Sequence, residues 1–169
     1  MIRPILKYGD ATLHEPARPV ASISMEIQQL IDDMVQTMYA APGIGLAAPQ
    51  VGVPLRIIVV DVSLGHDPNA LMTFVNPEFV ERGGVQLEDE GCLSVPGFNA
   101  TVVRPARAIL KGLDRSGQPQ QKEAIGLLAR AFQHEMDHLD GMLFVDRLRG
   151  IKRELIVRKI RKLTRAGKW

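Results

Sequence analysis

The chain has 169 residues, of which 46% are hydrophobic and 24% are charged, and its formal net charge is +2. This composition is typical of one compact globular domain with a hydrophobic core, and it excludes disordered and collagen-like chains. The longest strictly aliphatic run, residues 57–60, is too short to cross a bilayer, and the N-terminus lacks the apolar stretch of a signal peptide. We therefore expect one cytoplasmic domain spanning residues 1–169, with neither a membrane nor DNA among its partners.

The N-terminal quarter is predicted to form an extended arm followed by a helix. Several prolines within residues 1–21 favour the extended arm. Ser24 is a good N-cap residue, and apolar residues then recur at helical spacing to about Tyr39. The Pro42-Gly43 pair ends this helix.

The middle of the chain is predicted to be rich in β-strands. A run of β-branched residues at 56–60 indicates a buried strand. Further strands are expected at residues 72–76, 100–103 and 108–113, the last followed by a turn at 114–117. The preceding Gly- and Ala-rich segment, residues 43–50, is either an ordinary helix-to-strand connection or a backbone surface that a ligand can approach closely.

Two helices are predicted near the C-terminus, at about residues 125–139 and 151–165. Because strands cluster between helices without regular βαβα alternation, the pattern favours an α+β fold. We expect antiparallel or mixed β-sheets packed around the first of these helices, with the second as a C-terminal helix. One face of the first helix carries four residues at steps of four, three and four: Leu127, Ala131, His134 and His138.

The C-terminal segment is strongly basic. Residues 147–169 contain ten Lys or Arg and one acid, for a formal charge of +9, whereas the preceding residues hold eleven bases and eighteen acids, for −7. Such segregation suggests a polyanionic partner, although charge alone is explained more simply by a solvated helix face. The apolar stripe expected to dock this helix on the acidic body comprises Leu148, Ile151, Leu155, Ile160 and Leu163.

The sharpest local signal is the H-E-x-x-H sequence that begins at His134 and ends at His138. Histidines four residues apart project from the same side of a helix and can hold one metal ion. Glu135 lies on the adjoining face, where it can reach a water molecule without being a ligand. Such a pair also arises by chance on surface helices. Here Leu127 and Ala131 continue the same face toward an apolar interior, where unpartnered imidazoles are costly, so we interpret the pair as a metal site.

A catalytic metal site needs a third protein ligand and an open position. Downstream of the helix, the plausible ligands are Asp140, Asp146 and Glu154. Upstream lies Cys92, the only cysteine, whose thiolate is a strong ligand for a borderline metal. A single cysteine is also commonly a small buried hydrophobic residue. The spacing alone does not choose between these possibilities.

Three segments taken together carry a resemblance: residues 43–50 (GIGLAAPQ), 90–94 (EGCLS) and 133–141 (QHEMDHLDG). They resemble, in order and in spacing, the signature motifs of the peptide deformylase family, and the likeness extends over nearly the whole chain, including the long C-terminal helix of the bacterial type. The resemblance implies a metal-dependent hydrolase that removes the N-formyl group from N-formylmethionyl nascent peptides and releases formate. It also implies one Fe²⁺ per chain, for which Zn²⁺, Ni²⁺ or Co²⁺ can substitute.

The resemblance assigns the metal to three ligands: Cys92, His134 and His138. Glu135 would act as general base and then as general acid, taking a proton from the attacking water and passing it to the departing amine. Glu90 and Arg104 resemble the supporting ion pair of the family, although each could equally be an ordinary surface charge.

The resemblance also assigns groups that contact the substrate. The backbone N–H of Leu93 and the side chain of Gln50 would donate to the developing oxyanion. Gly45 would offer backbone hydrogen bonds to an extended substrate, as an added strand does. Residues expected to line the methionine pocket are Ile44, Leu127 and Ala131.

Two other classes of protein are open alternatives. A metalloendopeptidase could use the same helix with a downstream third ligand, and it would keep its metal when Cys92 is replaced. A noncatalytic ribosome- or RNA-binding module could be built on the basic C-terminal helix, and Glu135 would then be dispensable. Ribosome binding through this helix can also coexist with catalysis, since a deformylase must meet nascent chains.

Overall fold

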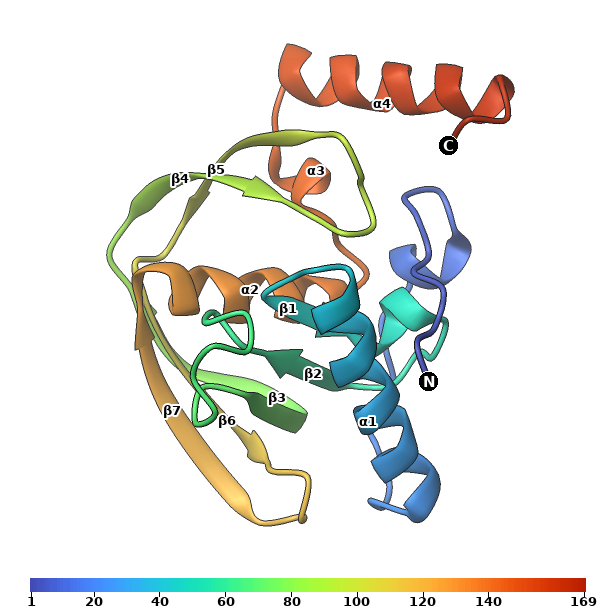
Figure 1. Cartoon of the computed structure of the whole chain (residues 1–169). Coiled ribbons are helices and arrows are strands. Elements are labelled where there is room, and N and C mark those ends of the chain that lie inside the picture. Colours follow the sequence, from blue (N-terminus) through green and yellow to red (C-terminus); the bar gives the residue numbers. More distant parts are fainter.

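The computed structural model describes residues 1–169 and has two β-sheets arranged around a central helix (Figure 1). The helices are α1 (Met25–Ala40), α2 (Gly126–Leu139), α3 (Phe144–Arg147) and α4 (Ile151–Arg165), with short 3-10 helices at Ala11–His14 and Ala48–Val51. The strands are β1 (Gly45–Ala47), β2 (Ile57–Val60), β3 (Met72–Gly83), β4 (Gln86–Gly91), β5 (Asn99–Arg104), β6 (Arg107–Leu113) and β7 (Pro119–Ile125). The expected α+β class is confirmed. No helix is both long and apolar enough to cross a membrane.

The larger sheet has five strands in the order β1-β2-β3-β6-β7, and every neighbouring pair is antiparallel. Strands β4 and β5 form a separate antiparallel pair. Helix α2 runs between the large sheet and the β4–β5 pair (Figure 1). Residues 129–139 of α2 are all buried, so the helix is enclosed on every side beyond its first turn.

Strand β2 shows why the core has two compartments. Ile58 and Val60 pack in the cluster that contains α2, where the rings of Phe74 and Phe132 meet edge to face at 5.5 Å. Ile57 and Val59, on the opposite face of the strand, pack with residues of α1. Because both faces of β2 are covered by helices, all four of its residues are apolar, as in strands buried on both sides.

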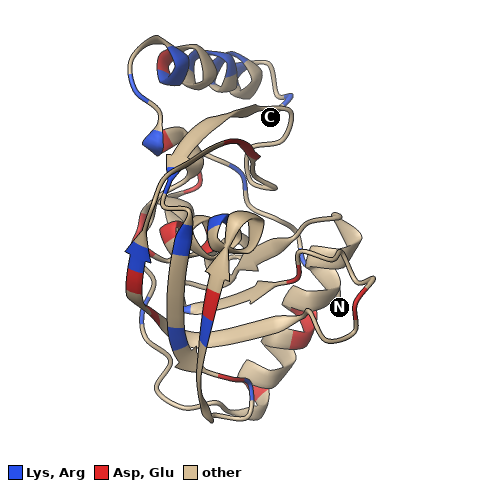
Figure 2. Cartoon of the chain, turned by 90° about the vertical axis from the view of Figure 1, so that its left-hand side faces the viewer, with Lys and Arg blue, Asp and Glu red and all other residues tan.

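Helix α4 lies apart from the two main compartments (Figures 1 and 2). It packs on α3 and on the N-terminal arm, and Ile160 is its only buried residue. The expected docking stripe is therefore wrong in part, since Ile151 is 71% exposed and Leu155 is 49% exposed. Their place is taken by Ile156 and Val157, because α4 meets the body along a face rotated from the predicted one.

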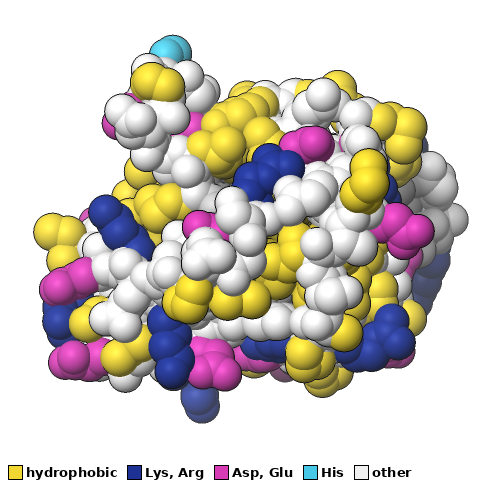
Figure 3. Space-filling view, turned by 90° about the horizontal axis from the view of Figure 1, so that it is seen from below, with side chains coloured by type: hydrophobic (Ala, Val, Ile, Leu, Met, Phe, Trp, Pro, Cys, Tyr) yellow, Lys and Arg dark blue, Asp and Glu magenta, His cyan; other side chains and the backbone are white.

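The charge asymmetry is visible on the surface. Lys and Arg follow one another along α4 (Figure 2). On the underside of the body, Lys and Arg lie next to Asp and Glu without a patch of one sign (Figure 3). The high density of basic residues is therefore a feature of α4, which lies apart from the rest of the protein.

The predicted helices agree closely with α1, α2 and α4, and the Ser24 hydroxyl caps α1 by accepting from the Ile27 amide at 3.3 Å. The strands were predicted less well. Sequence periodicity missed β1, β4 and β7, and it ended β3 seven residues early. Strand β7 was missed because it is an edge strand with polar, mostly exposed side chains. The arm expected to be wholly extended contains the 3-10 helix Ala11–His14, which Asp10 caps.

The loop between β2 and β3 (residues 61–71) is anchored by a buried carboxylate. Asp61 accepts hydrogen bonds from the Tyr39 hydroxyl at 2.6 Å, from the Ser63 hydroxyl at 2.6 Å and amide at 2.8 Å, and from the Gly65 amide at 3.1 Å. Burial by itself raises the pKa of Asp61, but these hydrogen bonds outweigh it and hold the pKa below its usual value. The ionised carboxylate therefore stabilises the folded loop.

Replacing Asp61 with Asn is expected to lower the free energy of unfolding at pH 7 by about 1.5–3 kcal/mol, because hydrogen bonds to a charged group are lost. Since the folded-state pKa is lowered, the contribution of the charge is complete above the unfolded value of about 3.9 and disappears as the pH falls through the folded value. Urea unfolding at several pH values should show wild type and variant converging in acid. A constant difference at every pH would contradict a role for the charge.

Candidate metal centre

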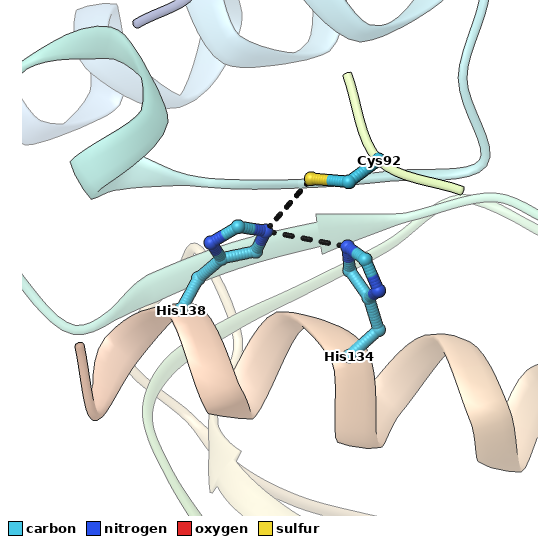
Figure 4. A group of neighbouring side chains, drawn as sticks. All are labelled: Cys92, His134 and His138. Atoms are coloured by element: carbon cyan, nitrogen blue, oxygen red, sulfur yellow. Dashed lines mark hydrogen bonds between the residues drawn. The ribbon is translucent and has the colours of Figure 1, made fainter. Parts of the chain in front are cut away.

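The two helical histidines and the single cysteine meet at one point (Figure 4). His134 and His138 project from the same face of α2, and their Nε2 atoms are 3.2 Å apart. Cys92 immediately follows β4, and its Sγ lies 3.3 Å from Nε2 of His138. The three donor atoms all lie within 4.8 Å of one another. Only the packing of β4 over α2 brings the cysteine to the helix.

The downstream acids expected as alternative ligands lie elsewhere. Asp140 forms an ion pair with Arg56 at 3.1 Å. Asp146 accepts from the backbone amide of Leu143 at 2.9 Å. No group of three possible ligands other than that of Cys92 is present. The geometry therefore favours the upstream thiolate over the arrangement expected of a metalloendopeptidase.

The donor set fits a transition metal. One thiolate and two imidazoles suit zinc, iron, cobalt or nickel, and three protein ligands leave a position open for substrate or water. Burial lowers the pKa of His138 well below its usual value, which favours the neutral imidazole that a metal requires. Its Nδ1 is buried without a hydrogen-bond partner, which leaves Nε2 as the nitrogen that faces the other two donors.

Behind the candidate ligands lies a buried carboxylate, Glu90, which orients His134. Its Oε1 is 2.5 Å from Nδ1 of His134, so Nε2 of that ring is left to face the metal position. Arg104 donates hydrogen bonds to Glu90 from Nε and Nη2, each at 2.9 Å, and Arg130 donates to Glu90 at 3.3 Å. Burial alone raises the pKa of Glu90, but His134 and Arg104 outweigh this effect and lower the pKa to about 2. Glu90 and Arg104 thus form a buried ion pair, as expected of a supporting pair.

The same network continues through Asp137, which lies between the two histidines in the sequence of α2. Asp137 accepts from Nη1 of Arg104 at 2.9 Å and from Arg147 at 2.6 and 2.9 Å. Arg130 also donates to the backbone carbonyl of Val102 and to the side chain of Gln86. Sequence reasoning did not identify these supporting roles of Asp137 and Arg130. These roles are revealed by the burial of both charged side chains within α2, which can be seen only in the folded chain.

Glu135 is buried beside the three candidate ligands without being placed as one of them. Its Oε1 is 4.0 Å from Nε2 of His134, and its Oε2 has no hydrogen-bond partner in the chain. Burial, together with the nearby charge of Glu90, raises the pKa of Glu135 to about 7. A carboxyl group that titrates near neutral pH is suited to accept and return a proton.

Gly45 provides the space that Glu135 occupies. A Cβ atom at position 45 would lie 2.6 Å from Oε1 of Glu135, a distance too short for any side chain. Gly45 is the first residue of β1, an edge strand of the large sheet. The glycine therefore makes room for the carboxylate, and it lies on an edge strand that borders the cavity.

Two polar groups converge beside the cysteine. Gln50 is held by the Ala47 amide, which donates to its Oε1 at 3.0 Å. Its Nε2 donates to the Ser94 hydroxyl at 3.1 Å and lies 3.7 Å from Sγ of Cys92. The backbone N–H of Leu93 donates to no other group of the chain. Both predicted oxyanion donors thus lie next to the ligands.

A cavity of about 480 Å³ opens over these groups. Ile44 and Leu127, predicted for the methionine pocket, line it. Leu127 is 53% exposed at its mouth, so the expectation that it faces the interior is wrong. Ala131, one turn further along α2, does not line the cavity and packs instead in the core beside Phe132. Leu127 lies in the exposed first turn of α2, whereas Ala131 lies in the buried part of the helix. Leu64 of the β2–β3 loop lines the cavity and was not anticipated.

Comparison with known proteins gives a consistent result. The sequence profile of the family described as Polypeptide deformylase matches residues 2–154. The chain is 47% identical to a peptide deformylase of Acidobacterium capsulatum over 169 residues, covering 100% of this chain and 99% of the relative.

Solved structures are equally similar. A peptide deformylase from Legionella pneumophila superposes with a TM-score of 0.92 at 46% identity and covers 99% of this chain and 98% of its own. A peptide deformylase from Synechococcus elongatus in complex with actinonin superposes with a TM-score of 0.87 at 42% identity, over 94% of this chain and 90% of its own.

Replacing Glu90 with Gln is expected to weaken metal binding about 10–100-fold, because the group that fixes the His134 ring is altered. Glu88 is the matched control, since it lies on the same strand and is exposed without an ion pair. Competition with a chelator, followed by metal analysis, measures both variants against wild type. Equal metal affinity in all three proteins would contradict the supporting role of Glu90.

Proposed function

The chain belongs to the polypeptide deformylase family, and we propose that Cys92, His134 and His138 hold the metal ion on which its activity depends. It is a metal-dependent hydrolase that removes the N-formyl group from the N-terminal methionine of newly synthesised proteins and releases formate. The observation that supports this ligand set is the position of the Cys92 thiol within hydrogen-bond distance of His138. The metal we propose is Fe²⁺, one per chain, with Zn²⁺, Ni²⁺ or Co²⁺ able to substitute.

The metal, when bound, would act as a Lewis acid and make a water molecule nucleophilic near neutral pH. We assign the accompanying proton transfer to Glu135. Its buried carboxylate accepts a proton at Oε as the formyl carbon is attacked and returns it to the departing amine nitrogen. The support for this role is that Glu135 combines burial, a raised pKa and an oxygen without an internal partner.

Developing negative charge on the formyl oxygen needs hydrogen-bond donors that are already in place. We assign this role to Nε2 of Gln50 and the backbone N–H of Leu93. The Gln50 amide is held by Ala47 and Ser94, so its position beside Cys92 is set before the substrate binds. The N–H of Leu93 is free of any competing acceptor in the chain.

The substrate is proposed to add to the unpaired edge of β1 as an extended strand, with the backbone of Gly45, which lines the cavity, supplying hydrogen bonds. The methionine side chain would then contact Ile44 and Leu127, which line the cavity. Ala131 is not included, because it lies in the core.

We propose that residues 1–169 act as one catalytic domain in the cytoplasm and that α4 recruits it to ribosomes. The support for one domain is that α4 and the N-terminal arm share a hydrophobic cluster with Val95, three residues beyond Cys92. The support for recruitment is the density of exposed bases on α4, because ribosomal RNA is a polyanion at the place where nascent chains emerge.

Replacing Glu135 with Gln is expected to reduce kcat/KM for formate release from a formyl-methionyl peptide by about 10²–10⁴-fold, because proton transfer is lost. Metal content and thermal stability should remain close to wild type, since Glu135 is not a ligand. Formate release and bound metal are measured on the same preparations. A Glu135→Gln variant that keeps metal and near-normal turnover would rule out the proposed role.

Replacing Arg158, Lys159 and Lys162 with Gln is expected to weaken co-sedimentation with ribosomes and to flatten its salt dependence, because fewer counterions are released on binding. The matched control removes three bases from the large sheet: Arg82, Lys111 and Lys122. Binding is measured across a range of salt concentrations. Equal loss in the two triple variants would contradict a specific role for α4.

A further inference from the structure

The β2–β3 loop stands beside the catalytic cavity and has no part in the mechanism described above. It leaves the large sheet after β2 and returns at β3, and it lies next to α2 and β1 in Figure 1. One of its residues, Leu64, lines the cavity together with Ile44 and Leu127. The loop therefore contributes an apolar side chain to a site otherwise built from β1, β4 and α2.

Leu64 has an unusual combination of backbone and side-chain properties. Its φ is +55°, in the left-handed region that residues other than Gly, Asn and Asp rarely adopt. Its side chain is 47% exposed, although leucine gains stability from burial. Glycine would fit this backbone better, so neither local conformation nor packing explains a leucine here. An outlier of this kind beside a functional site points to a role in binding.

The loop holds Leu64 in a fixed position. The four hydrogen bonds accepted by Asp61 close the loop around residues 63–65. The hydroxyl of Ser63 in turn accepts from the Asp67 amide at 3.0 Å. The Asp61 amide donates to the carbonyl of Ile44 at 2.8 Å, which ties the loop to the segment that leads into β1. Leu64 is thus preorganised relative to the strand edge that we assign to the substrate.

We infer that Leu64 determines specificity for the residue that follows the formylated methionine, favouring a large apolar side chain there. This inference rests on the proposed placement of the substrate along β1. Gln50 and Glu135, which act on the formyl group, are buried at the floor of the cavity, whereas Leu64 is half-exposed at its mouth. When the formyl group lies at the floor, the methionine that carries it contacts Ile44 and Leu127. The residue after the methionine then extends toward the mouth, beside Leu64. An apolar side chain there removes exposed Leu64 surface from water.

The test measures kcat/KM for formate release from formyl-Met-X peptides in which X is Leu, Phe, Ser or Gly. Two variants remove the apolar contact and suit the left-handed backbone: Leu64→Asn and Leu64→Gly. The matched control is Leu71→Asn, because Leu71 is exposed to 37% in the same loop but does not line the cavity. Bound metal is measured for every protein.

In wild type and in the Leu71 control, peptides with X as Leu or Phe should be preferred over X as Gly. Both Leu64 variants should lower this preference by about tenfold, in the range that one apolar contact provides, mainly through KM. Unchanged preference in both variants would overturn the inference. The first residue is varied separately by comparing formyl-norleucyl with formyl-alanyl peptides. If the Leu64 variants change the preference at this first position and not at X, the inference is also overturned. Absence of formate release by wild type from every peptide would instead contradict the function itself.

Discussion

The enclosure of α2 beyond its first turn is the constraint from which the rest of the structure follows. A helix with residues 129–139 all buried cannot place its polar side chains in water. Its apolar residues are accommodated by the large sheet, where Phe132 packs on Phe74. Its polar residues must find partners inside the protein, because a buried unpaired polar or charged group is costly. The β4–β5 pair exists as a separate layer above α2, and it supplies those partners.

The partners form a buried network of opposite charges. Glu90 and Arg104 come from β4 and β5, whereas Arg130 and Asp137 come from α2, so the ion pairs connect the two layers across the metal position. Breaking one member of such a network leaves an uncompensated buried charge, which makes the geometry strongly determined. Orientation of His134 by Glu90 is one result of this arrangement. Glu135, whose Oε2 has no hydrogen-bond partner in the chain, is the member of α2 to which we assign proton exchange.

The cavity floor, the cavity mouth and helix α4 are held in place by different interactions. The floor of the cavity is fixed by the network and by the hydrogen bonds of Gln50. Its mouth is shaped by Leu127 and Leu64, which are exposed but belong to a helix end and to a loop closed around Asp61. Helix α4 stands off the body, and its exposed face is rich in Lys and Arg. The proposed roles in catalysis, selection of the substrate and recruitment therefore fall on different residues.

The sequence by itself determined the features that depend on near neighbours along the chain. Four-residue spacing put both histidines on one face of a helix, Ser24 marked the start of α1, and the run at residues 56–60 marked a buried strand. The three motifs together also identified the family, although periodicity alone left the third ligand open. Tertiary structure decided which distant segments meet. It brought Cys92 to His138 across 46 residues, separated Leu127 at the cavity mouth from Ala131 in the core, turned a different face of α4 toward the body, and placed Leu64 at the site. Local spacing fixes the direction of a side chain relative to its own helix or strand. What that side chain contacts depends on how separate elements pack, and no periodicity in the sequence records it.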